Sequence, residues 1–486
     1  MNSNLKHFAA PLLAGSAAIF SACQEEAVDQ GKAEKPNIIF IYADDLGYGD
    51  LGVYGQKDIK TPYLDKMADE GMMFTQAYSG HTVCAPSRSS LMTGMHTGRT
   101  PIRDNFSIHG ERISFSDTVV TVANILERQG YVNGIFGKWG LGEMRTEGIP
   151  TRQGFHEFYG FLNQARAHSY CADMLWHNEE IVFIPENSAM RCGIHTAEWY
   201  QKKLLNFIVD NRENPFFIYY ATQLPHSELR STEQDLKPYL DEEGNSIFEE
   251  VPYYGSRGPV DIPFATHAAM VSQLDRHVGE IIGLLEEQGL SENTLVIFTS
   301  DNGSHRSGGY DPYYFNSSGG LRGYKRSLYE GGVRVPMIAK WPGKIEPGSV
   351  SDYVWAAWDL MPTAAELAGA GIPDDIDGVS AVPVFFGKQM ERPNAVYFEA
   401  FSGADRKGGG DMGVAVRKGK WKAIANVSLL DGLELYDMEQ DPGETQNLAS
   451  EYPEKVRMLK NIIIESRTHN KHWPLDDKIW EAFIAR

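Results

Sequence analysis

Positive charge is scarce in this chain. Its 486 residues include 45 Lys and Arg against 65 Asp and Glu, which leaves a formal net charge of −20. Contacts to nucleic-acid phosphates need clustered Lys and Arg, so this balance argues against a nucleic-acid-binding protein. An anionic ligand would have to be held by a local group of cations, against the field of the whole molecule.

Cysteine is also scarce. The four residues are Cys23, Cys84, Cys171 and Cys192. Cys171 and Cys192 could form a disulfide in an oxidising compartment, although their spacing alone does not decide it. That pairing would leave Cys84 as the unpaired thiol of the mature chain.

Cys84 begins the stretch CAPSRSSLMTG, residues 84–94. Pro86 suits the first turn of a helix, and the residues after it can continue as a short helix. A helix N-terminus presents backbone N–H groups and a positive dipole to an anion, and it acidifies a thiol placed there. These residues alone predict a cysteine nucleophile beside an anion site.

The apolar run at residues 8–22 is too short for a secure transmembrane helix, and it is typical of an export signal. Residues 1–23 are predicted to be a signal peptide and residues 24–35 a polar linker. Two interpretations remain: an ordinary cleaved signal, or a bacterial lipoprotein signal in which Cys23 carries a lipid anchor. We favour the second, although Phe20 stands where leucine is usual. Either way, we expect an exported protein, periplasmic or anchored at the outer-membrane surface.

Short apolar runs alternate with segments of helical periodicity over the first three quarters of the chain. Continuous apolar strands of this kind fit a mostly parallel sheet covered by helices on both faces, an α/β fold. The runs lie at 37–45, 131–140, 215–226 and 294–303, and the helices at 116–130, 196–212 and 266–289. Each run ends in polar residues, and the carboxyl edge of such a sheet is where ligands bind.

The pattern changes after about residue 375. Short strands joined by turns are predicted at 395–401, 412–426 and 433–444, followed by a closing helix at 451–467. We therefore expect a large catalytic domain at 36–375 and a smaller α+β domain at 376–486, which the length of the chain allows.

Four oxygen donors close two of the apolar runs, namely Asp44, Asp45, Asp301 and Asn302. Carboxylate and amide oxygens suit Ca²⁺ or Mg²⁺ better than Zn²⁺. Either pair alone could be an ordinary turn. Together, at the ends of two strands, they indicate a metal site.

Cations and a histidine are expected at the same edge. Lys138 closes the run at 131–140, Arg88 follows Cys84, and Lys325 lies in LRGYKRSLYEGG. Lysines and arginines are usually solvated, but grouped around a divalent metal these three would bind a compact tetrahedral oxyanion. His226, at the end of the run at 215–226, is a candidate general acid, although a lone histidine is more often a structural group.

The CAPSR stretch resembles the C-x-P-S-R signature of the type I sulfatases, in the alkaline-phosphatase-like superfamily. Further stretches resemble the family in the same order along the chain, and the resemblance covers about residues 36–447. They are PNIIFIYADDLGYGDLGVYG, GKWGLG, FTSDNG and YEGGVRVPMIAKWPG. The resemblance implies an alkaline-phosphatase-like fold and points to the polysaccharide-sulfatase branch.

In this family a maturation enzyme oxidises the signature cysteine to formylglycine. The resemblance implies that Cys84 becomes this aldehyde, whose hydrate attacks the sulfur of a sulfate ester and later expels sulfate. It implies one Ca²⁺ on the four oxygen donors, and His226 as the acid for the leaving alcohol. Lys138 and Lys325 would stabilise charge on the sulfuryl group, and Arg88 would orient the formylglycine hydroxyl.

One position departs from the family pattern. Many members have a histidine two residues after the lysine, assigned to the hydrated aldehyde as the base for releasing sulfate, where this chain has Gly140. His168 and His305 are candidates to replace it, with ordinary loop roles as the alternative. The segment 160–180 resembles polysaccharide sulfatases that share GKWG, so Arg166, His168 and His305 are expected near the substrate.

The expected function is hydrolysis of a carbohydrate sulfate. The favoured substrate is a galactose or N-acetylgalactosamine sulfate, from a glycosaminoglycan or an algal galactan. Two alternatives stay open: a phosphate monoester or diester hydrolase of the same superfamily, since fold does not fix function, and a non-catalytic glycan-binding lipoprotein.

Overall fold

The computed structural model describes residues 35–485, apart from 189–190, 256–257, 403–410, 429 and 431. The predicted signal peptide, Cys23 and all of the linker except Lys35 lie outside the described residues. Among the helices that the structure describes, none combines the length and apolar character needed to cross a membrane.

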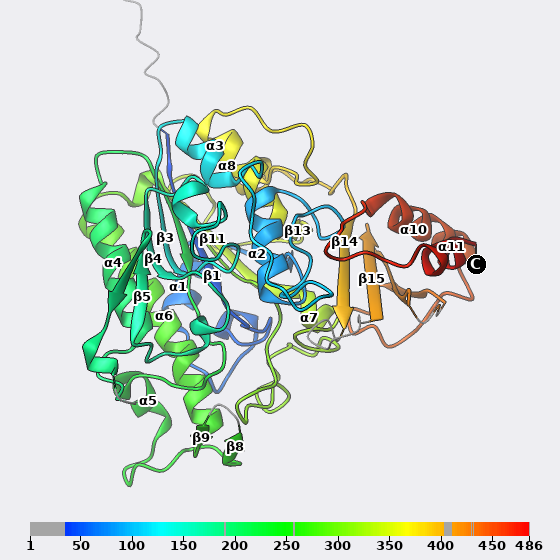
Figure 1. Cartoon of the computed structure of the whole chain (residues 1–486). Coiled ribbons are helices and arrows are strands. Elements are labelled where there is room, and N and C mark those ends of the chain that lie inside the picture. Colours follow the sequence, from blue (N-terminus) through cyan, green and yellow to red (C-terminus); the bar gives the residue numbers. More distant parts are fainter. Residues whose placement is uncertain are drawn as a thin grey trace, which may run out of the picture. The chain divides into compact units, whose positions relative to one another are not determined.

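An eleven-stranded mixed sheet forms the centre of the molecule (Figure 1). Its middle consists of parallel strands in the order β10-β1-β7-β3-β4. These are β10 (Thr294–Ser300), β1 (Asn37–Ala43), β7 (Phe216–Ala221), β3 (Val132–Lys138) and β4 (Glu157–Phe161). The four predicted apolar runs are therefore four neighbouring strands that share one carboxyl edge.

Antiparallel pairs extend this parallel centre on both sides. Beyond β10, β11 (Arg334–Lys340) and β2 (Met72–Tyr78) each run antiparallel to the preceding strand, and β12 (Ser349–Ser351) and β13 (Trp355–Ala356) pair parallel with β2. Beyond β4, β5 (Met174–His177) and β6 (Glu180–Phe183) are antiparallel. The predicted α/β fold is confirmed, and these flanks make its sheet mixed.

Helices cover both faces of the sheet, as predicted. Alternate residues of a strand point to opposite faces, so Ile38, Phe40 and Tyr42 pack on one side of β1, and Ile39 and Ile41 on the other. The first face carries α2 (Cys84–Thr93), α3 (Val122–Arg128) and α8 (Leu360–Ala368). The second carries α1 (Pro62–Asp69), α4 (Thr196–Asp210) and α6 (Pro263–Glu287).

The predicted helix at 116–130 is shorter than expected. It begins at Val122, because the Thr121 side chain accepts the backbone N–H of Asn124 and the Asn124 side chain accepts that of Thr121. This reciprocal capping fixes the start of the helix. The remaining short elements are α5 (Glu233–Leu236), α7 (Glu330–Val333), α9 (Val382–Phe385), β8 (Tyr253–Gly255) and β9 (Gly258–Val260).

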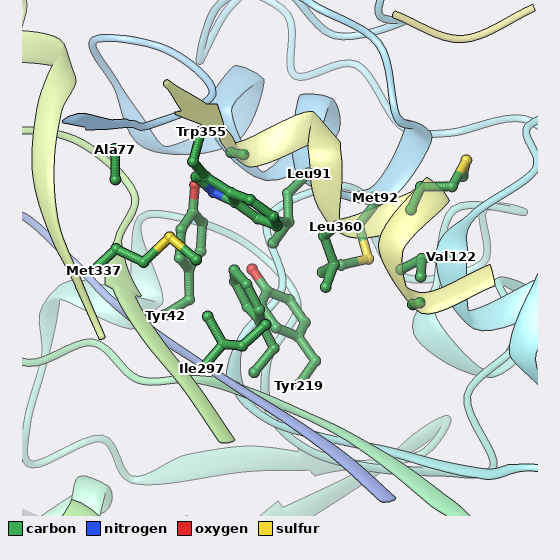
Figure 2. Close-up of a cluster of buried hydrophobic side chains, with 14 of the residues drawn as sticks. Tyr42, Ala77, Leu91, Met92, Val122, Tyr219, Ile297, Met337, Trp355 and Leu360 are labelled. Carbon is green, nitrogen blue, oxygen red and sulfur yellow. The ribbon is translucent and has the colours of Figure 1, made fainter. Parts of the chain in front are cut away.

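Helix α2 is buried over its whole length, and this holds for all ten of its residues. Figure 2 shows Leu91 of this helix beside Trp355, and Met92 beside Leu360 and Val122, in a cluster of buried side chains. A helix held on every side by dense packing has little freedom to shift. The side chains at its N-terminal end are therefore fixed relative to the carboxyl edge of the sheet.

The C-terminal part forms an antiparallel sheet in the order β14-β15-β16-β17. The strands are β14 (Val396–Ser402), β15 (Asp411–Lys418), β16 (Trp421–Asn426) and β17 (Glu434–Asp437), followed by α10 (Pro453–Ser466) and α11 (Asp477–Ala485). The smaller α+β part is confirmed, but its hydrophobic residues join the core beneath α2. The boundary at residue 375 stays a prediction.

Cys171 and Cys192 form a disulfide, which confirms the pairing that the sequence left open. The bridge joins the segment that precedes β5 to the segment that precedes α4. Among the described residues Cys84 is the free cysteine, and it is buried.

Candidate active site

The strand-end residues come together at the carboxyl edge of the parallel strands. Asp44 and Asp45 directly follow β1, Lys138 ends β3, and Asp301 and Asn302 follow β10; each is fully buried. His226, five residues beyond β7, is 5% exposed. Residues up to 258 positions apart thus share one site, as the parallel arrangement predicts.

Helix α2 brings Cys84 and Arg88 into this group. The Cys84 Sγ lies 3.2 Å from Asp44 Oδ1, and Lys325 Nζ lies 3.6 Å from the same sulfur. One turn further along the helix, the Arg88 guanidinium donates to Asp301 Oδ2 and to the Lys138 carbonyl, both at 2.8 Å. The helix therefore adds a thiol and a cation to the strand-end carboxylates.

The thiol of Cys84 is not acidified, contrary to the prediction from its place at a helix N-terminus. Burial, followed by the charges of Asp301 and Asp44, raises the pKa of Cys84 well above its usual value. Lys138 and Lys325 act in the opposite direction and are outweighed. The unmodified thiol therefore stays protonated near neutral pH, and a protonated thiol is a poor nucleophile.

Buried carboxylates and lysines alternate around the sulfur. Lys138 Nζ donates to Asp44 Oδ2 at 2.6 Å, and Lys325 Nζ donates to Asp45 Oδ1 at 2.5 Å. Burial alone would raise the pKa of Asp44, but Lys138 and other neighbouring cations hold it well below its usual range. Burial and the Asp44 charge raise the pKa of Asp301 to about 7.

Two buried oxygens in this group lack a hydrogen-bond partner within the described part of the chain, Asp45 Oδ2 and Asn302 Oδ1. A buried oxygen without a hydrogen bond is costly, and the His226 Nε2, 3.4 Å from Asp45 Oδ2, does not supply one. Ligand atoms of Asp44, Asp45, Cys84 and His226 all lie within 4.8 Å of one another. Asp44 and Asp45 belong to this group, and carboxylates of this kind fit a hard divalent cation. The full predicted set with Asp301 and Asn302 stays a prediction.

Three histidines lie at the mouth of the site. The His226 Nε2 is 3.4 Å from Asp45 Oδ2, and its ring stacks on His168 with centroids 4.3 Å apart. The ring of His305 is 6.1 Å from that of His226. Burial first, and then the Lys325 charge, lowers the pKa of His226 well below its usual value. Its imidazole is therefore neutral at neutral pH.

A cleft of about 520 Å³ opens above Cys84 and Lys325, and all three histidines line it. Arg166 is not among the described residues that line this cleft. Its half-exposed side chain lies 3.7 Å from Asp173 Oδ1 instead. The structure therefore groups His168 and His305 with the reactive centre and leaves Arg166 apart from it.

Further polar residues line the cleft that the strand-end argument did not identify. They sit in loops, where periodicity carries no signal, although Gln164 falls in the segment 160–180 that resembles polysaccharide sulfatases. The residues are Asp104, Asn105, Arg112, Gln164, Ser227, Arg306, Ser307, Tyr324 and Arg326.

Comparison with known proteins gives consistent matches. Residues 36–370 match the sulfatase family, and residues 322–469 match the C-terminal region of N-sulphoglucosamine sulphohydrolase. Arylsulfatase A of Homo sapiens is 32% identical, covering 88% of this chain and 87% of that protein. The N-acetylgalactosamine-6-O-sulfatase of Bacteroides thetaiotaomicron is 28% identical, covering 94% and 98%. The crystal structure of Ps i-CgsB with k-i-k-neocarrahexaose superposes with a TM-score of 0.75 at 26% identity, covering 93% and 97%.

Proposed function

The chain belongs to the sulfatase family and is a sulfuric ester hydrolase, and from this premise we propose that it removes sulfate from a carbohydrate. The proposed substrate is a galactose or N-acetylgalactosamine sulfate of a glycosaminoglycan or an algal galactan. Support comes from a relative named for N-acetylgalactosamine 6-O-sulfate and from a structural neighbour with a bound neocarrahexaose.

The observation that carries the proposal is the set of buried cations around residue 84. Lys325 lines the cleft beside Cys84, whereas Lys138 and Arg88 are fully buried and donate to Asp44 and Asp301. Such fixed cations stabilise charge that develops on a transferring sulfuryl group without reorganising. His226 lines the same cleft, and an anionic sulfate ester bound beside it would raise the pKa of its imidazole, so we assign it to protonate the leaving sugar oxygen.

We further propose that Cys84 is the precursor of formylglycine. A thiol whose pKa is raised by burial is unsuited to attack sulfur, which supports conversion of the side chain. The hydrated aldehyde would supply an oxygen nucleophile at this position. Arg88, one helical turn away, is placed to orient that group, and a sulfatase-maturating enzyme is the partner that this assignment requires.

We assign Asp44, Asp45, Asp301 and Asn302 to a single Ca²⁺. The unpaired oxygens of Asp45 and Asn302 support this assignment. A divalent cation there would neutralise charge on the sulfate oxygens. Export is proposed from the signal-like N-terminus, with Cys23 as a lipid anchor, and the Cys171–Cys192 disulfide agrees with an oxidising compartment.

Hydrolysis is tested on protein co-expressed with a maturation enzyme. We expect release of inorganic sulfate from 6-sulfated N-acetylgalactosamine or from sulfated galactan fragments, measured by ion chromatography. We also expect aryl sulfate to be turned over much faster than the matched aryl phosphate, because the site suits a singly charged ester. A preference for the phosphate would favour the phosphoesterase alternative, and binding of the glycan without turnover would favour the lectin-like one.

Calcium binding is tested through stability. Ca²⁺ at 100 times its Kd should stabilise the folded protein by about 2.7 kcal/mol, because it binds the folded state alone. Asp45→Asn should remove most of the Ca²⁺-dependent rise in Tm, since it removes one charge from the site. Asparagine tolerates the positive φ of 70° at this position.

The matched control is Asp374→Asn, the same chemical change at an exposed residue. It should leave the Ca²⁺-dependent rise in Tm unchanged. An equal rise in the wild-type protein and both variants would place any bound Ca²⁺ elsewhere.

A further inference from the structure

Gly140 marks the place where a family histidine is missing, and the structure shows what fills that place. Its backbone N–H donates to the Leu162 carbonyl at 2.9 Å, and its φ is 80°. A Cβ built on Gly140 would lie 2.3 Å from the Nε2 of Gln164. The Gln164 amide therefore occupies the space that a side chain at residue 140 would enter.

The side-chain amide of Gln164 is buried beside the cleft without a hydrogen-bond partner in the described part of the chain. It is 7% exposed and lines the cleft together with Cys84. Within the described residues, neither its Nε2 nor its Oε1 has a hydrogen-bond partner. Leaving both ends of a buried amide unpaired is unfavourable, so the bound state of the protein should supply the missing partners.

The amide also defines the chemistry of its ligand. Nε2 can only donate and Oε1 can only accept. A sulfate group accepts hydrogen bonds but donates none, so it would leave Oε1 unpaired. A hydroxyl group does both, and it can satisfy either end of the amide.

We propose that Gln164 takes the place of the missing histidine and hydrogen-bonds the hydroxyl that residue 84 carries in the mature enzyme. This inference rests on the proposed function, because Cys84 itself has no such hydroxyl. A carboxamide is not basic at neutral pH, so Gln164 holds the hydroxyl in place and does not take its proton. Gln164 would therefore provide the hydrogen bond that the family histidine makes, but it would not act as a base.

The first test replaces the amide with an apolar group of similar size. Gln164→Leu should lower kcat by about 10²-fold on an aryl sulfate and on a sugar sulfate alike, as loss of one well-placed hydrogen bond does. KM should change little. The Tm should not fall, because the amide has no hydrogen bond to lose, and mass spectrometry should show the same formylglycine content.

The matched control is Gln201→Leu, at a buried glutamine of α4 whose Nε2 donates to the His277 carbonyl at 3.0 Å. It should lower the Tm and leave kcat unchanged, the opposite of the result for Gln164→Leu. A structural role for Gln164 would make the two variants behave alike.

The second test uses the Tm, not activity, to ask whether a side chain at residue 140 and the side chain of Gln164 compete for the same space. Gly140→His should lower the Tm, since its Cβ meets Gln164. Adding Gln164→Gly should recover part of that loss, a coupling that a double-mutant cycle measures directly. Histidine is one of the residues that accept a positive φ more readily, which makes the double variant feasible.

Three results would overturn the inference. The first is a kcat of Gln164→Leu within threefold of the wild-type value. The second is a fall in the kcat of Gln164→Leu that is seen on sugar sulfates but not on aryl sulfates. The third is that Gly140→His and Gln164→Gly change the Tm additively. A loss confined to sugar sulfates would make Gln164 a contact to a sugar hydroxyl. A wild-type protein with no turnover of any sulfate ester would overturn the proposed function and this inference with it, whereas the first three results leave the proposed function standing.

Discussion

Replacing Cys84 with alanine is expected to abolish sulfate-ester turnover, with a loss in kcat of about 10⁴-fold or more, as for removal of a covalent nucleophile in other hydrolases. The neighbouring carboxylate oxygens of Asp44, Asp45 and Asp301 are already engaged by Lys138, Lys325 and Arg88, so we do not expect them to replace the lost group. Alanine cannot be oxidised to the aldehyde that we propose for residue 84, so co-expression with a maturation enzyme should not restore turnover. Turnover of an aryl sulfate under single-turnover conditions measures the loss.

The fold should survive this substitution. The Cys84 sulfur contacts the Asp44 carboxylate and the Lys325 ammonium, both of which keep other partners. The expected loss of stability is about 1 kcal/mol, typical of a small buried truncation. Ser90→Ala is the matched control on the same helix, because the Ser90 Oγ is buried without a hydrogen-bond partner in the described residues. A Cys84→Ala protein that keeps wild-type turnover would place the nucleophile elsewhere.

The largest expected loss of stability comes from a residue remote from the chemistry, Lys422 of β16. Its Nζ lies 2.8 Å from both Glu330 and Glu444, and all three side chains are buried. Burial alone would raise the pKa of Glu330, but Lys422 and the nearby arginines lower it to about 2. Burial raises the pKa of Glu444 to about 7. One lysine thus holds two carboxyl groups together at the junction of α7 and the small sheet.

Lys422→Met should lower the free energy of unfolding by about 3–5 kcal/mol, because it removes the cation that Glu330 and Glu444 share and leaves Glu330 only its longer ion pair with Arg334, at 3.4 Å. Urea unfolding followed by tryptophan fluorescence measures the change. Lys420→Met is the control two residues earlier, where a 39% exposed lysine pairs with Asp437 at 2.6 Å. An exposed pair of this kind contributes about 0–1 kcal/mol. A loss below 1 kcal/mol for Lys422→Met would mean that the acids find other partners.

The sequence was informative where a regular element delivers a residue to the site. Asp44, Lys138 and Asp301 could be grouped because neighbouring parallel strands end at one edge. The disulfide was one permitted pairing, and the structure selected it. The antiparallel strands at both sides of the sheet were not predicted, because an apolar run has the same sequence pattern whether its strand is parallel or antiparallel to its neighbour.

Two features of the site depend on three-dimensional surroundings that spacing does not encode. The pKa of Cys84 is set by burial and by Asp301 and Asp44, which outweigh the helix N-terminus that the sequence indicated. Gln164 reaches the site from a loop, and only the missing side chain of Gly140 marks its place. The sequence shows that the family histidine is absent at residue 140, but it does not show which side chain occupies that space in the folded protein.

The burial of α2 also bears on whether residue 84 could be modified before or after the chain folds. Every residue from Cys84 to Thr93 is buried in the folded chain; Cys84 meets the cleft, but Ser87 and Arg88 have no exposed surface. If Cys84 is the precursor of formylglycine, as proposed, a maturation enzyme would have to bind CAPSR before this helix is packed. Folding and oxidation would then compete for the same ten residues, and a molecule that folds first would keep its unmodified thiol. The yield of active protein should then depend on how fast the chain folds relative to how fast it is modified.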